Sequence, residues 1–247
     1  MKHLDQKKRQ DDILELIIRE YTENAHTVSS EGLRKKYNLP MSSATLRNVM
    51  AELEGAGYIS HIHTSSGRVP TPEGFRYYVD MLMSDQEDLV VDYEYIYTLI
   101  KKALNYQYQI ENMLEEISRV VSSITHYMGL GMCSGRERVF FSGTHFIFEQ
   151  PDFEDIVVLK NLFQALEEKY TDLWSFVNKG MDKDVKVFIG KDIDILRSRD
   201  FSLALSSFDM NKMNERIVFG VVGPVRMDYS SVVKKLKRVK EYLEDNF

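Results

Sequence analysis

The residues best placed to do chemistry are three polar side chains near one face of an expected helix. Apolar residues recur at i, i+3, i+4 and i+7 between positions 42 and 55, namely Leu46, Val49, Met50 and Leu53. A rotation of about 100° per residue places Asn48 on the opposite, small-residue face, with Thr45 and Arg47 beside it. Asparagine can pair with an adenine edge and arginine with guanine. The pattern therefore predicts a helix that reads bases in a major groove.

The next residues indicate a wing that follows this helix. Gly55 and Gly57 are typical of a helix end, and Tyr58 to Ser60 is prone to form a strand. A small polar loop then leads to Arg68, which we expect to contact phosphates or the minor groove. The loop residues expected at the DNA are His63, Thr64, Ser65 and Ser66. The alternative is an amphipathic helix followed by an ordinary surface loop.

Upstream residues predict the other helices of a helix-turn-helix. Residues 12–21 and 30–37 have helical patterns, and a turn follows at 38–40. Ser42 or Ser43 would cap the third helix, and both are also candidate phosphate contacts. The basic run 34–36 either contacts phosphate or is a solvated face. Residues 1–85 contain 11 Lys and Arg against 12 Asp and Glu, so binding to DNA should depend on specific contacts more than on bulk charge.

A long helix, or a nearly continuous helical pair, is expected over residues 93–128. Its apolar positions follow a heptad spacing, interrupted by Gln107. We expect this seam to form a subunit interface, although it could also pack on the chain's own second domain. The expected dimerisation residues are Ile96, Ile100, Ile110, Leu114, Ile117, Val121 and Ile124.

The last part of the chain mixes strand and helix patterns. A glycine-punctuated linker is expected at 129–135 and a long helix from 152 to about 177, with a last helix from 228 onwards. Expected strands are 139–148, 185–189, 201–208 and 217–222. The fold class is therefore α+β. We expect a winged-helix domain at 1–85, a helical connector at 86–130 and an α+β domain at 131–247.

Composition and motifs argue against several classes of function. The net charge of −6 disfavours a general polyanion binder, and the single cysteine indicates a reducing compartment. No apolar run of about 18 residues predicts a membrane span, so we expect a cytoplasmic protein. No catalytic or phosphate-loop signature is present, and His61, His63 and Cys133 form only a weak metal pattern. We therefore expect no enzyme activity, cofactor or metal.

Several separated segments resemble one family of bacterial regulators, the heat-inducible transcription repressors of the HrcA family. The segments are SSATLRNVMAELE, GYISHIHTSSGR, PTPEGFRYYVD and GVVGPVRMDYSSVV. The resemblance implies a dimeric repressor that binds an inverted-repeat operator before chaperone operons and depends on the chaperonin. It also implies a GAF-like sheet in the last domain. Only about ten residues separate the long helix from the segment RVFFSGTHFIFEQPDF, so the chain looks shortened by the family's inserted dimerisation domain.

Two functions follow from these observations. The first is a dimeric winged-helix repressor of heat-shock and chaperone genes. The alternative is a regulator of other genes whose α+β domain senses a small ligand or a protein. Dependence of DNA binding on a ligand would separate the two.

Overall fold

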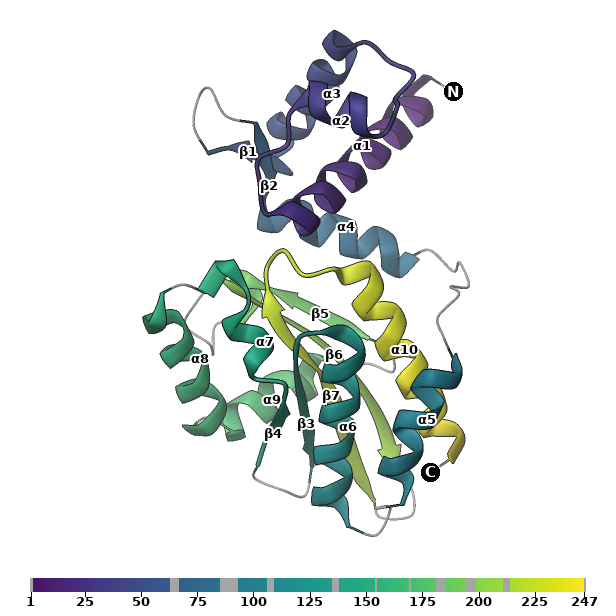
Figure 1. Ribbon diagram of the computed structural model, residues 1–247, viewed down its shortest axis with the longest axis vertical. Helices are drawn as coiled ribbons and strands as arrows, with labels where there is room; N and C mark the ends of the chain where they lie inside the picture. Colours follow the sequence, from purple (N-terminus) through teal and green to yellow (C-terminus); the bar gives the residue numbers. More distant parts are fainter. Residues whose placement is uncertain are drawn as a thin grey trace. The chain divides into compact units, whose positions relative to one another are not determined.

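The computed structural model divides the chain into two compact units, Met1–Gln86 and Glu87–Phe247 (Figure 1). The structure describes residues 2–62, 67–84, 93–105, 109–134, 138–153, 155–168, 170–180, 185–193, 199–210 and 214–246. Each unit has its own buried apolar core.

The first unit is a winged helix. Its elements in chain order are α1 (Lys2–Asn24), α2 (Ser30–Lys36), α3 (Ser43–Gly55), β1 (Ile59–His61), β2 (Arg68–Pro70) and α4 (Pro72–Ser84). Its core includes Leu14 and Ile17 of α1, Leu46 and Met50 of α3, and Phe75 of α4, each at most 1% exposed. The apolar stripe read from the sequence is therefore the inner face of α3.

Side chains at the helix starts fix the bounds of these helices. Ser29 accepts a hydrogen bond from the backbone N–H of Gly32 (3.1 Å), and Ser42 accepts one from Thr45 (3.0 Å). Thr71 caps α4 in the same way, through the N–H of Gly74 at 3.0 Å. Of the two caps that the sequence offered for α3, Ser42 and Ser43, the structure uses Ser42.

The second unit is a five-stranded antiparallel sheet with helices on both faces. Its helices are α5 (Tyr93–Leu104), α6 (Ile110–Thr125), α7 (His145–Phe148), α8 (Ile156–Glu168), α9 (Tyr170–Gly180) and α10 (Tyr229–Asn246), with short 3-10 turns at Pro151–Phe153 and Gly190–Asp192. Its strands are β3 (Met128–Cys133), β4 (Phe140–Ser142), β5 (Lys186–Ile189), β6 (Phe201–Met210) and β7 (Glu215–Pro224), in the order β4-β3-β7-β6-β5. This arrangement confirms the α+β class.

The two faces of the sheet pack against different helices. Alternate residues of the strands, such as Leu130, Leu203 and Val218, share a buried cluster with Leu162 of α8 and Leu173 of α9. The opposite face lies against α6 and α10 (Figure 1). The sheet is thus buried on both sides, which explains why β6 and β7 read as continuous apolar runs.

Two expectations about the start of the second unit were wrong. Residues 129–135 are not a linker, because β3 covers Met128–Cys133 and lies between β4 and β7. The expected strand 139–148 ends at Ser142, since Gly143 has a φ of 68° and α7 follows. The helix expected from residue 152 begins at Ile156 and corresponds to α8 and α9, with residue 169 between them outside the described residues.

The expected dimerisation seam lies inside the second unit. Helices α5 and α6 pack against each other, and α6 packs on the sheet. The candidate residues are each at most 6% exposed in the single chain: Ile96, Ile100, Ile110, Leu114, Ile117, Val121 and Ile124. These buried side chains cannot also face a second subunit, so the interface assignment is corrected. A heptad pattern requires a partner helix but does not say whether the partner belongs to the same chain. Gln107 lies outside the described residues.

A close approach between α6 and β3 explains the glycines that resembled a linker. A Cβ built on Gly129 would lie 2.0 Å from the backbone carbonyl oxygen of Ser118, and one on Gly131 would lie 2.9 Å from that of Leu114. Real Cβ atoms do not approach so closely, and these contacts are to backbone. The helix can therefore lie directly on the strand only because β3 lacks side chains at these two positions.

We predict that Gly129→Ala destabilises the second unit by about 2 kcal/mol or more, because the methyl group forces α6 away from the sheet. The single tryptophan, Trp174, lies in α9, so its fluorescence during urea unfolding reports on this unit. Gly55→Ala is the matched control, since its new Cβ meets nothing within 4 Å. An unchanged Trp174 transition in Gly129→Ala would contradict the close packing.

Candidate nucleic-acid interface

Helix α3 presents a small polar face to solvent. Ala44, Thr45, Arg47, Asn48 and Ala51 are exposed, whereas the apolar residues opposite them are buried. Small residues on this face leave the helix backbone accessible, so it can approach a flat or grooved partner closely. The structure thus brings together the three side chains that the sequence identified as base-reading candidates.

Arg47 and Asn48 have no hydrogen bond or ion pair within the part of the chain that the structure describes. Ser42 is more constrained, since its hydroxyl caps α3 and also lies 2.9 Å from the Thr45 hydroxyl. Ser43 is half-buried in the first turn of α3. Among the described residues, the Arg47 guanidinium and the Asn48 carboxamide are therefore the groups on this helix most available to a ligand.

The basic run at the end of α2 is largely neutralised within the unit. Lys35 pairs with Glu31 at 2.8 Å, and Lys36 pairs with Glu20 at 2.6 Å and Glu23 at 3.0 Å. Hydrogen bonds to Glu20 and Glu23 raise the pKa of Lys36 well above its usual value, and the hydrogen bond from Lys35 lowers the pKa of Glu31. These lysines are less available to phosphate than their sequence suggests.

Strand β2 of the wing is joined to the segment between α1 and α2. His61 and Arg68 are opposite each other in the β1–β2 pair. The N–H of Val28 donates to the carbonyl of Arg68 (2.8 Å), and the N–H of Arg68 donates back to Val28 (2.9 Å). The predicted wing contacts His63, Thr64, Ser65 and Ser66 lie outside the described residues.

Glu54, near the end of α3, holds both strands of the wing, and sequence reasoning missed it. The Arg68 guanidinium donates to its carboxylate at 3.2 Å, and His61 bonds to the other carboxylate oxygen. Arg68 is only 18% exposed, so it lies at the base of the wing and is already paired. An acid at a helix end followed by a cation 14 residues later was the available signal, but spacing alone does not reveal the pairing.

Electrostatics favour the charged form of Glu54. Partial burial raises the pKa of Glu54, but the hydrogen bonds from His61 and Arg68 outweigh this effect and hold the pKa below its usual value. The ion pair therefore persists at neutral pH and links the end of the candidate recognition helix to the wing.

Side chains of α1 contact the same end of α3, and α4 contacts the residue Tyr58 that follows it. Gln6 and Gln10 of α1 donate to Glu52 at 3.2 and 2.7 Å. The Tyr77 hydroxyl of α4 donates to Asp11 at 2.8 Å, and its ring stacks on Tyr58 with centroids 4.6 Å apart. Burial, followed by the bond to Asp11, raises the pKa of Tyr77 to about 12, so the phenol remains a donor.

The described residues meet neither the requirements of a metal site nor those of a membrane-spanning helix. Across the described residues, no group of three or more His, Cys, Asp or Glu side chains could hold a metal ion. No helix in the described ranges is both long and apolar enough to span a bilayer.

Comparison with known proteins identifies the family of the chain. A family model described as the HrcA protein C terminal domain matches residues 97–233, more than half of the sequence. The chain belongs to the HrcA family. Relatives named heat-inducible transcription repressor HrcA align along almost their whole length. The protein of Clostridium acetobutylicum is 26% identical, covering 98% of each chain, and that of Chlorobaculum parvum is 25% identical, covering 95% of each.

A solved structure supports the fold, and the HrcA relatives support the shortening. A crystal structure described as a hypothetical protein at 2.2 Å resolution superposes with a TM-score of 0.75 at 18% identity, covering 97% of this chain and 98% of that one. The alignment with the Chlorobaculum parvum relative spans 341 positions, whereas this chain has 247 residues. A substantial part of that HrcA protein therefore has no counterpart here.

We predict that Glu54→Gln lowers the thermal stability of the first unit at neutral pH. Because the folded pKa of Glu54 is depressed, its stabilising contribution is present above the ordinary pKa of 4.5 and is lost as the pH falls through the folded value. The difference in Tm between wild type and variant should therefore shrink in acid, as measured by calorimetry.

Asp80→Asn is the matched control for this experiment. Asp80 is an exposed carboxylate of the same unit without an ion pair in the described part of the chain. A Tm difference for Glu54→Gln that is the same at pH 3 and pH 7, or equal to that of Asp80→Asn, would contradict the ion-pair assignment.

Proposed function

We propose that this protein is a DNA-binding transcriptional repressor of heat-shock and chaperone genes that binds an inverted-repeat operator as a dimer. The observation that carries the proposal is that Arg47 and Asn48 are exposed on α3, without a hydrogen bond or ion pair among the described residues, beside a wing held by Glu54. The names of the HrcA relatives support the class of regulator. Dependence on the chaperonin remains a prediction from family resemblance.

In this proposal α3 enters the major groove with its small face towards the bases. Asn48 would bond an adenine edge and Arg47 a guanine edge, while Thr45 contacts a base or its methyl group. Ser42 and Ser43 lie at the start of α3, where backbone N–H groups and the helix dipole favour phosphate. We assign Arg68 to positioning the wing, because its guanidinium is paired with Glu54.

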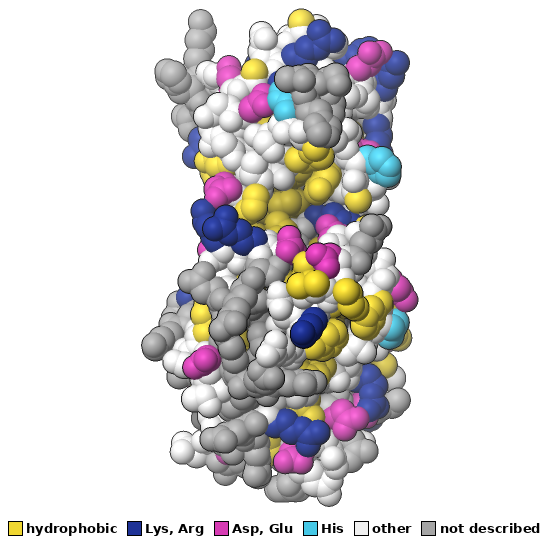
Figure 2. Space-filling view, turned by 90° about the vertical axis from the view of Figure 1, so that its left-hand side faces the viewer, with side chains coloured by type: hydrophobic (Ala, Val, Ile, Leu, Met, Phe, Trp, Pro, Cys, Tyr) yellow, Lys and Arg dark blue, Asp and Glu magenta, His cyan; other side chains and the backbone are white. Residues whose placement is uncertain are grey.

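A dimer needs a surface other than the α5–α6 seam, because that seam is buried within one chain. Phe148 at the end of α7 and Ile156 and Val157 at the start of α8 are 60%, 69% and 56% exposed. Figure 2 shows hydrophobic side chains gathered on this face of the second unit. Exposed apolar patches of this kind mark interaction sites, and an inverted repeat requires two reading heads. We therefore propose that a second copy of the chain covers this patch.

The DNA proposal predicts distinct effects for base-reading residues. Arg47→Ala and Asn48→Ala should each cost about 1–3 kcal/mol on a preferred duplex selected from a random pool, and should relax base preference at one position in each half-site. Arg9→Ala removes the same charge from exposed α1 and is the control for bulk electrostatics. Equal loss on selected and random DNA would reassign Arg47 and Asn48 to backbone contacts, and no preference for any duplex would refute the proposal.

The dimer proposal is tested by placing charge on the exposed patch. Ile156→Glu with Val157→Glu should shift the protein to monomer in analytical ultracentrifugation, because two charges would be buried in the interface. Both side chains are exposed, so the fold should tolerate the change. Ile62→Glu, which alters an apolar residue 55% exposed in the first unit, is the control. A double variant as dimeric as wild type would locate the interface elsewhere.

A further inference from the structure

A groove between α5 and α10 of the second unit has no part in the proposed DNA or dimer contacts. It encloses about 560 Å³, within the range of small-molecule sites, and residues of both helices line it. The packing of α5 against α10 shapes this groove, so both walls belong to one folded unit.

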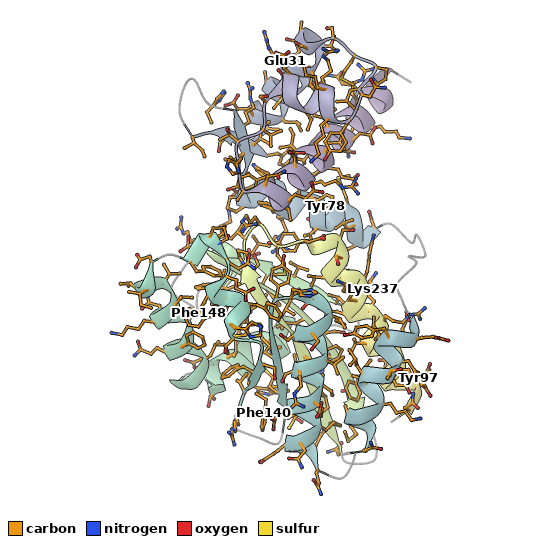
Figure 3. All side chains as sticks on the ribbon, in the orientation of Figure 1. Glu31, Tyr78, Tyr97, Phe140, Phe148 and Lys237 are labelled. Carbon is orange, nitrogen blue, oxygen red and sulfur yellow. The ribbon has the colours of Figure 1, made fainter. Side chains whose placement is uncertain are left out.

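Two tyrosines form the aromatic part of the groove. Tyr97 of α5 and Tyr242 of α10 meet edge to face, with ring centroids 4.7 Å apart and planes at 80°. Tyr97 is 47% exposed and is labelled on α5 in Figure 3. Burial, followed by the hydrogen bond with Tyr97, raises the pKa of Tyr242 to about 12, so its phenol stays neutral at physiological pH. The rings thus offer negative π faces without a phenolate charge.

The charges that line the groove are predominantly negative. Arg238 is paired with Glu241, whereas Glu94 and Asp245 have no ion pair in the described ranges. Glu94 also suits the positive end of α5, since it lies in the first turn. Asp245 has no such explanation: it lies at the negative end of α10, whose last turn contains no basic residue. A carboxylate at this position adds to the negative potential of the helix dipole.

An organic cation can interact with both the aromatic rings and the carboxylates of this groove. Aromatic faces attract ammonium groups, and carboxylates neutralise them. A bare metal ion suits the groove less well, because Ile96, Tyr97 and Tyr242 contribute apolar surface and no group of metal ligands was found among the described residues. The groove is better matched to a molecule that alternates cationic groups with hydrocarbon.

We propose that the groove between α5 and α10 binds an aliphatic polyamine, with ammonium groups at Asp245 and Glu94 and methylene groups against Tyr97 and Tyr242. This assignment does not depend on DNA binding, because every group involved lies in the second unit. It gives the α+β domain a ligand of defined chemical class.

The test is calorimetric titration of spermidine into the full-length protein at 0.15 M salt, without DNA. We expect saturable binding with one site per chain. Tyr97→Leu should weaken it about tenfold by removing the ring, and Tyr97→Phe should retain most of it. Asp245→Asn should weaken binding by about threefold or more. Glu111→Gln is the matched control, because it removes one exposed carboxylate at the start of α6 in the same unit.

Specific outcomes would overturn the proposal. Absence of saturable binding to wild type would do so, as would equal weakening by Glu111→Gln and Asp245→Asn, which would indicate bulk charge only. Unchanged spermidine affinity in Tyr97→Leu would contradict the proposed contact with the Tyr97 ring. Binding of a lysine-rich peptide without binding of spermidine would assign the groove to a protein partner. Circular dichroism of each variant checks that the fold is retained, and the exposed Asp245 gives a variant that should not disturb the core.

Discussion

The geometry of the candidate DNA interface depends on one carboxylate. Glu54 stands at the end of α3 and binds both wing strands, through His61 on β1 and Arg68 on β2. A helix as short as α3 needs a second contact with the DNA to fix its orientation in the groove. In the proposed interface, the wing supplies that contact. The backbone bonds between Val28 and Arg68 add a link to the start of α2. Recognition helix, wing and helical turn are therefore held together by polar contacts at their edges, while the core beneath them is apolar.

Internal ion pairs also change which basic side chains are available to bind DNA phosphates. Lys35, Lys36 and Arg68 are candidate phosphate contacts in the sequence, yet each is paired with an acid of its own unit. Neutralised cations add little to the long-range attraction of a polyanion. Arg47 remains without such a pair in the described part of the chain. Under the proposed function, the protein would discriminate among DNA sequences more than it would bind all of them tightly.

Local patterns predicted the local structure well. The stripe Leu46–Leu53, the serine caps and the apolar runs of β6 and β7 follow from periodicity and capping chemistry, which act over a few residues. The failures concern partners distant in sequence. The glycines of β3 look like a linker until α6 is seen lying on them, and the seam from Ile96 to Ile124 looks intermolecular until its own hairpin and sheet are in place. Likewise, no local sequence pattern around Glu54 indicates that Arg68 is its partner.

The position of β3 in the sheet has a consequence for the order in which the chain can fold as it is synthesised. Strand β3 pairs along its whole length with β7, about ninety residues later in the chain, and β6 pairs with β7 as well. The centre of the sheet is therefore closed by one of its last parts to leave the ribosome. Until β7 is available, α6 and β3 cannot pack against a complete sheet, so their apolar side chains stay accessible to solvent or to other proteins. The winged helix forms a compact unit from the first 86 residues, so it can fold before β7 has been synthesised and the sheet completed.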